Sequence, residues 1–377
     1  MNIVFVSNYF NHHIKPIADH FYQLFGNQFI FVETVQAMKI ENLKGAQNDD
    51  FENIPYLYSI YKCNKKYISV ENLYNLVAEC DLAIQGDAKD IFFKQRFEKN
   101  KLTFRISEHI LKGNKFDFLR IVKYFLRNIK IRNKEVYLLC ASSHVSSDMK
   151  KCFSFKNKMY KWGYFPEIIK NNKNLVNGRV EKILWVGRMI EWKHPEIIIT
   201  TGEIIRDLNY NCCITAIGDG PRLQYIKDEV IRRKLDSIVT FKSSLTNIEV
   251  QNEMKDSDVL IFSSDIGEGW GAVLNEGMAN GCVVIANSDA GSTNYLVKNE
   301  INGFVYNNSQ ESFIDALKNL FTLSEVDIEN IKYLAYSTIY KEWSGSVAVE
   351  RLIKVVDNMK FGDSENNVYN EGPMSRA

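Results

Sequence analysis

The sequence predicts an α/β protein with two successive domains, each built on a parallel β-sheet. The chain has 377 residues, a length that suits about two domains of 100–200 residues each. Short apolar, β-branched segments alternate with longer helical patterns, which is the signature of βαβ construction. This alternation is interrupted once, around Gly163 and Pro166, and then starts again. These three observations predict the fold class.

In the first half, the apolar segments predict strands at residues 3–7, 29–33, 82–85, 102–106 and 137–141. A helical pattern over residues 14–25 follows the first of them. Strands this apolar are expected where helices cover both faces of the sheet. The first domain is therefore predicted to span residues 1–165.

In the second half, strands are predicted at residues 183–186, 213–217, 238–241, 259–262 and 283–286, and helices at residues 195–208, 309–320 and 347–359. The second domain is predicted to span residues 166–345. A terminal helix over 346–360 is expected to cross back to the first domain, and 361–377 is expected to be a loose polar tail. Because parallel sheets bind ligands at the carboxyl ends of their strands, the two sheets are expected to face a central cleft.

The formal net charge of +1 hides two oppositely charged halves. Residues 1–166 hold 25 Lys/Arg against 16 Asp/Glu, a net charge of +9, and residues 167–377 hold 22 against 30, a net charge of −8. A basic half indicates an anionic partner, such as nucleic acid, a membrane surface or a phosphorylated substrate. Two domains that merely differ in surface charge are the alternative.

The apolar runs and the cysteines of the sequence predict where the protein is located. No uncharged apolar run of 18 residues occurs, and no basic segment precedes an apolar one at the N-terminus, so neither a membrane span nor a signal peptide is expected. The seven cysteines include no C-x-x-C pair. Free thiols in a reducing compartment explain an odd cysteine number best, which predicts a cytoplasmic protein.

The most informative segment follows the predicted strand at 259–262. A loop with glycines at 267, 269 and 271 leads into a helix that begins near Gly271. Glycines permit close approach of the backbone to a ligand, and the N-terminus of the helix is a ready anion site. Glu268 lies in the loop, and Glu276 lies about one and a half turns inside the helix. Both carboxylates can therefore contact one bound ligand.

A second cluster, with Gly187, Arg188 and Lys193, lies between the strand at 183–186 and a helix that begins near Pro195. Arginine offers a bidentate fork and lysine a compact charge, and both suit a pyrophosphate. Surface salt bridges are the alternative interpretation.

These motifs resemble the donor domain of the family 4 retaining glycosyltransferases, which have the GT-B architecture of two Rossmann-like domains. The resemblance covers roughly residues 182–303. It rests on Val186-Gly187-Arg188 with Lys193, on Gly218-Asp219-Gly220-Pro221, on Glu268-x7-Glu276 in its glycine context, and on Asn302-Gly303-Phe304-Val305.

The resemblance implies a nucleotide-diphosphate-sugar as donor, with no cofactor and no metal ion. Glu276 would bind the ribose hydroxyls. Arg188 and Lys193 would bind the pyrophosphate and stabilise the leaving group. Glu268 would lie beside the transferred sugar. Further donor contacts are implied for Gly187, Gly218, Gly269, Trp270 and Gly271.

The first half departs from the family pattern. Its first strand is followed by residues 7–13, which contain no glycine where the family has a glycine-rich loop. His12 or His13 would contact acceptor or phosphate there, or this is a surface loop with incidental histidines. His109 resembles the family's cleft histidine and is expected to take part in catalysis; helix capping or core packing is the alternative.

Residues 116–134 predict a basic amphipathic helix, with Phe118, Val122, Phe125 and Ile129 at helical spacing. Such a helix can lie on an anionic membrane, or it packs on the core with a solvated basic face. Nothing resembles an RNA-binding motif or a Walker A loop, so no nucleic-acid partner is expected.

The sequence thus predicts transfer of a sugar, with retention, to a carbohydrate or lipid-linked acceptor. The implied setting is bacterial surface polysaccharide synthesis, in the cytoplasm or at the inner face of the cell membrane. A nucleotide-sugar epimerase of related fold and a non-catalytic partner subunit are the alternatives.

Overall fold

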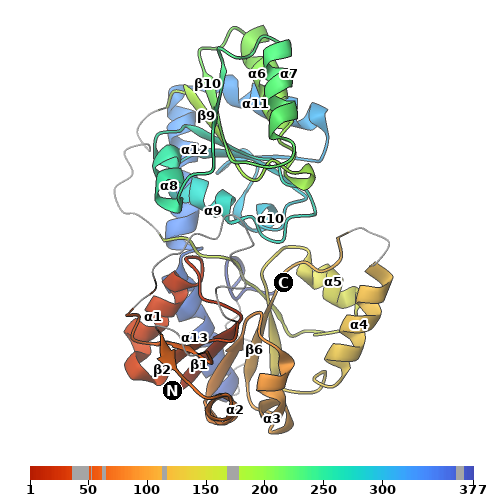
Figure 1. Cartoon of the computed structure of the whole chain (residues 1–377), viewed down its shortest axis with the longest axis vertical. Coiled ribbons are helices and arrows are strands. Elements are labelled where there is room, and N and C mark those ends of the chain that lie inside the picture. Colours follow the sequence, from red (N-terminus) through yellow and green to blue (C-terminus); the bar gives the residue numbers. More distant parts are fainter. Residues whose placement is uncertain (36–50, 52, 62–64, 113–116, 168–177, 362–368) are drawn as a thin grey trace. The chain divides into compact units, whose positions relative to one another are not determined.

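A computed structural model describes residues 1–35, 51, 53–61, 65–112, 117–167, 178–361 and 369–377 of the chain. The chain divides into two compact units (Figure 1). Unit 1 comprises Met1–Glu167 and Gly345–Ala377, and unit 2 comprises Ile168–Ser344. Unit 1 is therefore built from both ends of the chain.

Unit 1 contains a fully parallel sheet of eight strands. In sheet order these are β4 (Lys66–Tyr67), β3 (Leu57–Ser59), β2 (Phe29–Glu33), β1 (Ile3–Ser7), β5 (Leu82–Gln85), β6 (Thr103–Ser107), β7 (Val136–Cys140) and β8 (Met159–Lys161). All five residues of β1 are buried. Strands covered on both faces need such apolar sequences, which agrees with the predicted βαβ construction.

The helices of unit 1 are α1 (Lys15–Phe25), α2 (Val70–Glu79), α3 (Lys94–Glu98), α4 (Asp117–Ile129), α5 (Val145–Lys151) and α13 (Gly345–Phe361). The C-terminal helix α13 packs against α1 (Figure 1). Gly345 permits this approach, because a Cβ there would lie 3.0 Å from the backbone of Pro16. The Ser69 hydroxyl caps α2 by accepting a hydrogen bond from the Asn72 amide.

Unit 2 contains a fully parallel sheet of six strands. In sheet order these are β11 (Val239–Lys242), β10 (Cys213–Ile217), β9 (Lys182–Val186), β12 (Val259–Phe262), β13 (Val283–Asn287) and β14 (Phe304–Tyr306). The prediction of an α/β protein with two parallel sheets is confirmed.

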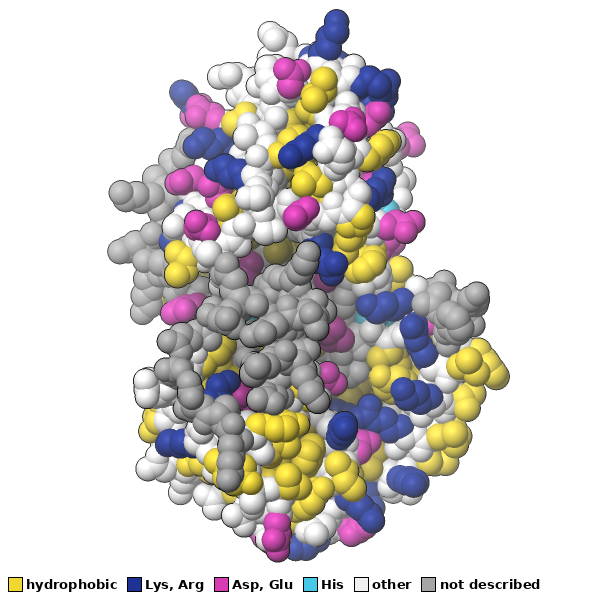
Figure 2. Space-filling model, in the orientation of Figure 1, with side chains coloured by type: hydrophobic (Ala, Val, Ile, Leu, Met, Phe, Trp, Pro, Cys, Tyr) yellow, Lys and Arg dark blue, Asp and Glu magenta, His cyan; other side chains and the backbone are white. Residues whose placement is uncertain are grey.

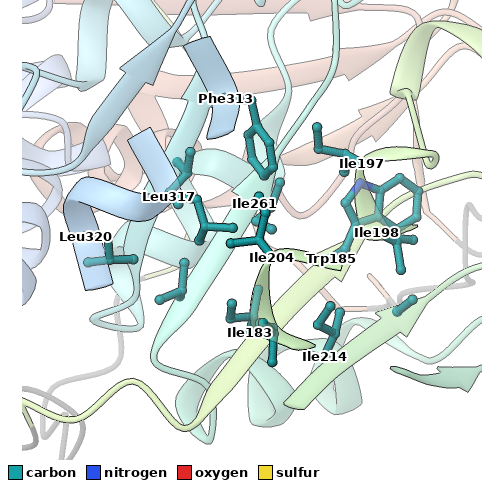
Figure 3. Packing of buried hydrophobic residues seen from close by; sticks show 14 of the residues in the cluster. Ile183, Trp185, Ile197, Ile198, Ile204, Ile214, Ile261, Phe313, Leu317 and Leu320 are labelled. Atoms are coloured by element: carbon teal, nitrogen blue, oxygen red, sulfur yellow. The ribbon is translucent and has the colours of Figure 1, made fainter. Parts of the chain in front are cut away.

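The helices of unit 2 are α6 (Ile197–Asp207), α7 (Leu223–Arg232), α8 (Asn247–Lys255), α9 (Ala272–Ala279), α10 (Thr293–Leu296), α11 (Gln310–Phe321) and α12 (Glu325–Lys341). Helices α6 and α11 pack on each other and on the sheet. Figure 3 shows the core between them, where Ile183, Trp185 and Ile261 of the sheet meet Ile198 of α6 and Leu317 of α11. This core supports β9 and β12, the two strands that carry the sequence motifs.

Two expectations from the sequence are wrong in part. The amphipathic helix predicted over 116–134 ends at Ile129, because residues 130–133 form a turn before β7; residue 116 lies outside the described residues. The end of the predicted loose tail is ordered by packing along β8. Met374 donates its backbone N–H to the carbonyl of Lys161, and Arg376 forms an antiparallel bridge with Tyr160.

Of the cysteines that the structure describes, Cys80, Cys140, Cys152 and Cys282 are buried, and all six are free thiols. Cys212 is half-buried and Cys213 is exposed. No described helix is both long enough and apolar enough to cross a lipid bilayer.

Candidate active site

Both sequence motifs of unit 2 lie where its strand order reverses. From β9 the chain continues to β10 and β11 on one side, and it then places β12, β13 and β14 on the other side. The motif loops follow the carboxyl ends of β9 and β12, which pair directly. Open parallel sheets bind ligands outside the strand ends at such a reversal point. The topology therefore brings the two motifs to one candidate binding site.

The loop after β9 lies directly against the loop that contains Gly218 and Gly220. A Cβ on Gly218 (φ +138°) would lie 1.9 Å from the carbonyl oxygen of Gly187, and one on Gly220 (φ +155°) would lie 2.5 Å from that of Met189. The Met189 amide also donates a hydrogen bond to the carbonyl of Asp219. Any side chain at these glycines would separate the loops, so their backbones are held together as one wall of the site.

Arg188 lies in this wall with its side chain exposed. Its guanidinium forms no hydrogen bond or ion pair with another residue in the described part of the chain, so it is available to an anionic ligand. Lys193 differs, because its ammonium group forms an ion pair with the carboxylate of Glu268. Both of these side chains are mostly covered, with 18% and 17% exposed. The pair links the motif after β9 to the motif after β12.

A chain of hydrogen bonds fixes the backbone beneath this ion pair. The Trp185 indole N–H donates to the Ser263 hydroxyl over 2.9 Å, and that hydroxyl donates to the carbonyl of Lys193 over 2.6 Å. Trp185 and Ser263 are both buried. The backbone of Lys193 is therefore tied to β9 and to the segment that follows β12.

His194 forms a second link between the two motif loops. Its Nδ1 lies 2.9 Å from Glu196 Oε1 and its Nε2 lies 3.0 Å from Asp265 Oδ2. The hydrogen bond to Glu196, together with the one to Asp265, outweighs burial and raises the pKa of His194. Because Asp265 also accepts a hydrogen bond from the Gly267 amide over 2.7 Å, this network shapes the glycine-rich loop as well.

The glycine-rich loop turns into α9 at Gly271, which has φ +87°. A Cβ at this position would lie 2.2 Å from the Phe262 ring, so both the conformation and the space require glycine. Glu276 follows within α9 and is 6% exposed. Burial raises the pKa of its carboxyl group to about 7. Near neutral pH this carboxyl group can therefore accept or donate a hydrogen bond to a ligand hydroxyl.

Trp270 is a buried residue of the glycine-rich loop. Its side chain is 1% exposed, and its indole N–H donates to Asn275 Oδ1 over 2.8 Å. Its ring packs near those of Tyr295 and Trp343, with centroids 6.1 Å and 5.9 Å away. The indole is thus a packing group, which leaves the backbone of the loop, including Gly269, as the part that can contact a ligand.

Unit 1 has its own pocket, of about 340 Å³, at the carboxyl ends of β1, β5 and β6. The strand order of this sheet reverses between β1 and β5, the equivalent place to the motif site in unit 2. Gly86 follows β5 and has no room for a Cβ, which would lie 2.6 Å from the Ser7 hydroxyl oxygen. Asn8 closes the same side through a 2.9 Å hydrogen bond to Asp87. The pocket is a second candidate binding site.

His109 lines this pocket and is 6% exposed. Its Nδ1 lies 2.7 Å from Asp148 Oδ2, an oxygen that also accepts hydrogen bonds from the amides of Ile110 and Leu111. Its Nε2 is buried and has no hydrogen-bond partner among the described residues. Asp148 thus orients the ring so that Nε2 remains available to a molecule in the pocket.

The two histidines of the first loop are placed differently. His13 lines the pocket and stacks on Tyr164, with ring centroids 5.5 Å apart. His12 does not line the pocket, although its ring lies 3.8 Å from that of His13. The side chain of Asn11 accepts hydrogen bonds from the amides of His13 and Ile14, which fixes the turn into α1.

Three residues of the pocket region have no local signature in the sequence. Arg105 is buried and donates to Asp90 Oδ1 over 2.9 Å, while Arg127 of α4 forms a fork with both oxygens of Asp90. Burial alone would raise the pKa of Asp90. The hydrogen bonds and positive charges of these arginines outweigh burial and hold that pKa at about 2. Asp148 is the third residue; its role depends on contact with His109, 39 positions earlier.

The chain is similar to glycosyltransferases in sequence and in structure. Residues 167–335 match the family model "Glycosyl transferases group 1", whereas no curated protein matches the chain. HepE of Anabaena, solved with UDP and glucose, is 12% identical; the match covers 95% of this chain and 99% of HepE with a TM-score of 0.65. A glycosyltransferase of Rickettsia africae is 16% identical over 97% and 99% of the two chains (TM-score 0.64). Sucrose-phosphate synthase of Thermosynechococcus elongatus is 13% identical over 96% and 99% (TM-score 0.61).

The two parallel sheets and the matched domain define the protein as a glycosyltransferase with the GT-B fold. The part of the chain that matches the group 1 glycosyl transferases, residues 167–335, includes every motif residue of unit 2.

Proposed function

We propose that this enzyme transfers a sugar, with retention of configuration, from a nucleotide-diphosphate-sugar to a carbohydrate or lipid-linked acceptor. One observation supports the proposal: the Lys193–Glu268 ion pair joins the loop that carries Arg188 to the loop that leads into α9 and Glu276. A site with this set of groups suits an anionic ligand that also presents hydroxyl groups. The complexes of HepE with UDP and UDP-glucose make UDP-sugars the first donors to test.

In the proposed reaction, the bond between the sugar C1 and the diphosphate oxygen breaks while the acceptor oxygen bonds to C1 on the same face. The acceptor proton passes to the departing phosphate. Arg188 and Lys193 stabilise the negative charge that develops on this leaving group, a role that a metal ion fills elsewhere. Glu276 binds the ribose hydroxyls, and Glu268 lies beside the transferred sugar. The backbone of Gly187, Gly218 and the 269–271 loop completes the donor site.

The pocket of unit 1 is proposed as the acceptor site. His109 offers Nε2 to a hydroxyl group of the reacting sugars, and His13 offers a ring face backed by Tyr164. The proposed setting is the synthesis of bacterial surface polysaccharide, with the enzyme in the cytoplasm.

Incubation of the full chain with a panel of nucleotide sugars and candidate acceptors tests the proposal. We expect release of nucleoside diphosphate together with a glycosylated acceptor that keeps the anomeric configuration of the donor. Conversion of free nucleotide sugar into its epimer would identify an epimerase instead. Binding of nucleotide sugar without turnover across the panel would identify a non-catalytic partner subunit.

His109→Ala is expected to lower the rate of transfer by about 100-fold, because a group that orients the reacting sugar is lost. The Kd of the nucleotide, which binds unit 2, should stay unchanged. Asp148→Asn should lower the rate less, since an amide oxygen can still accept one of the three hydrogen bonds. Steady-state kinetics and calorimetric nucleotide titration measure the two effects.

The matched control is His20→Ala, a histidine of α1 that does not line the pocket. This variant should transfer sugar at the wild-type rate. Equal rates for His109→Ala and His20→Ala would remove His109 from the catalytic assignment.

A further inference from the structure

Helix α4 of unit 1 carries a row of exposed apolar side chains. The exposed fractions are 72% for Phe118, 64% for Leu119, 40% for Val122, 58% for Leu126 and 48% for Ile129. At about 100° per residue, these five positions fall within one arc of about 100° on the helix. They form a continuous apolar stripe along α4. Single apolar residues scattered over a surface are ordinary, but a continuous stripe calls for an explanation.

The stripe is not the face with which α4 packs on its own unit. Asn128 is buried on the inner face, where its side chain accepts a hydrogen bond from Arg105. Tyr124 and Asp117 lie on the same side of the helix as Asn128 and are less exposed than the stripe. The apolar stripe is therefore additional to the core contact, and the core-packing alternative from the sequence does not account for it.

Basic side chains occupy the adjacent sector of the helix. By the same helical spacing, Arg120, Lys123 and Arg127 fall within the next arc of about 60° beside the stripe. Arg120 and Arg127 are ion-paired with Asp117 and Asp90, so among the described residues the lysines carry the uncompensated charge of this row. Lys130 continues this row in the turn after α4 and is exposed. Figure 2 shows dark-blue Lys and Arg side chains next to yellow hydrophobic ones in the region of α4 and α5. The apolar stripe of α4 is thus bordered by a row of basic side chains.

The end of α5 extends this surface. Phe153 follows α5, is 72% exposed and contacts Phe125 of α4 edge-on, with ring centroids 6.4 Å apart. Lys150 and Lys151 in the last turn of α5 are exposed. Residues 112–161 as a whole hold 13 Lys/Arg against three Asp/Glu. The positive charge found in the first half of the sequence is therefore concentrated around the stripe.

We propose that the surface formed by α4 and Phe153 docks the enzyme on an anionic lipid bilayer. The apolar stripe enters the boundary between headgroups and acyl chains, and the lysines contact lipid phosphates. Charge decides against a second copy of the chain as the occupant, because two such basic surfaces would repel each other. This surface is separate from the donor chemistry of unit 2 and goes beyond the proposed transfer reaction.

Co-sedimentation of the full chain with vesicles tests the proposal. We expect binding to phosphatidylcholine vesicles that contain phosphatidylglycerol, weaker binding at high salt, and little binding to phosphatidylcholine alone. Phe118→Ser/Leu126→Ser should lower the partition coefficient about 10-fold or more, because two large apolar groups are lost from the contact. Lys123→Glu/Lys130→Glu should lower it about 1000-fold, since the variant changes the charge by four units and each charge near the surface contributes about 1 kcal/mol.

Ile231→Ser/Ile248→Ser is the matched control, because these residues of α7 and α8 are 65% and 74% exposed but lie in unit 2. This variant should bind vesicles like the wild type. Wild-type binding by Phe118→Ser/Leu126→Ser, or equal binding to both kinds of vesicle, would overturn the proposal. So would sedimentation velocity of the chain alone, if it found a dimer that Phe118→Ser/Leu126→Ser dissociates. None of these experiments measures sugar transfer. A failure of the proposed transfer reaction would therefore be distinguishable from a failure of membrane binding.

Discussion

Arg188→Ala is expected to lower kcat for sugar transfer by about 10²- to 10³-fold, the usual cost of removing one group that stabilises charge in a transition state. Arg188 has the only described guanidinium on the loop between β9 and α6, and its side chain is exposed beside the strand ends. The neighbouring cation, Lys193, is already paired with Glu268. Among the described residues, Arg188 is therefore the cation of this loop that no carboxylate neutralises. Without it, the departing diphosphate loses that stabilising positive charge.

The same change should leave the fold intact. An exposed side chain without a buried partner contributes less than about 0.5 kcal/mol to the free energy of unfolding. Arg188→Lys should keep part of the activity, because a charge remains while the bidentate fork is lost. Arg206→Ala, an exposed arginine at the end of α6, is the matched control and should retain full activity. Near-normal turnover by folded Arg188→Ala would contradict the assignment.

Lys332→Met is expected to lower the free energy of unfolding of unit 2 by about 3–5 kcal/mol, the cost of leaving a buried charge without its partner. Lys332 of α12 has a fully buried side chain and donates to Asp258 Oδ1 over 2.8 Å. The other oxygen of Asp258 accepts hydrogen bonds from the amides of Glu181 and Lys182, at the start of β9. The pair therefore ties α12 to the central strands of the sheet.

Urea denaturation followed by tryptophan fluorescence measures this loss, since four of the five tryptophans belong to unit 2. Lys341→Met, an exposed lysine on the same helix, should change the midpoint little. Lys332→Met/Asp258→Asn should recover much of the lost stability, because the double variant has no unpaired charge. A single variant as stable as the Lys341→Met control would mean that the ion pair contributes nothing net.

The central strands could be predicted from the sequence because their burial on both faces demands continuous apolar runs. The bounds of β1, β2, β5, β10 and β12 agree with the prediction at both ends. The short strands β3, β4, β8 and β14 were not predicted, since two or three residues carry no period. Their pairing is decided by the neighbouring strand, which is a contact distant in sequence.

The two candidate sites also differ in how much of each could be predicted from the sequence. In unit 2, each motif is a short segment after one strand, so its residue types and spacing are visible in the sequence. In unit 1, His109 follows β6 and Asp148 lies on the helix after β7, and only the parallel pairing of β6 with β7 brings them together. Periodicity also predicted the amphipathic character of α4, but which face is covered depends on the packing partners.

Because unit 1 contains segments from before and after unit 2 in the sequence, the two units are completed at different times during translation. As the chain leaves the ribosome, residues 168–344 emerge before α13 and the final segment that pairs with β8. Unit 2 can thus complete its sheet while unit 1 still lacks the helix that packs against α1. Unit 1 can complete its packing only after α13 has been synthesised.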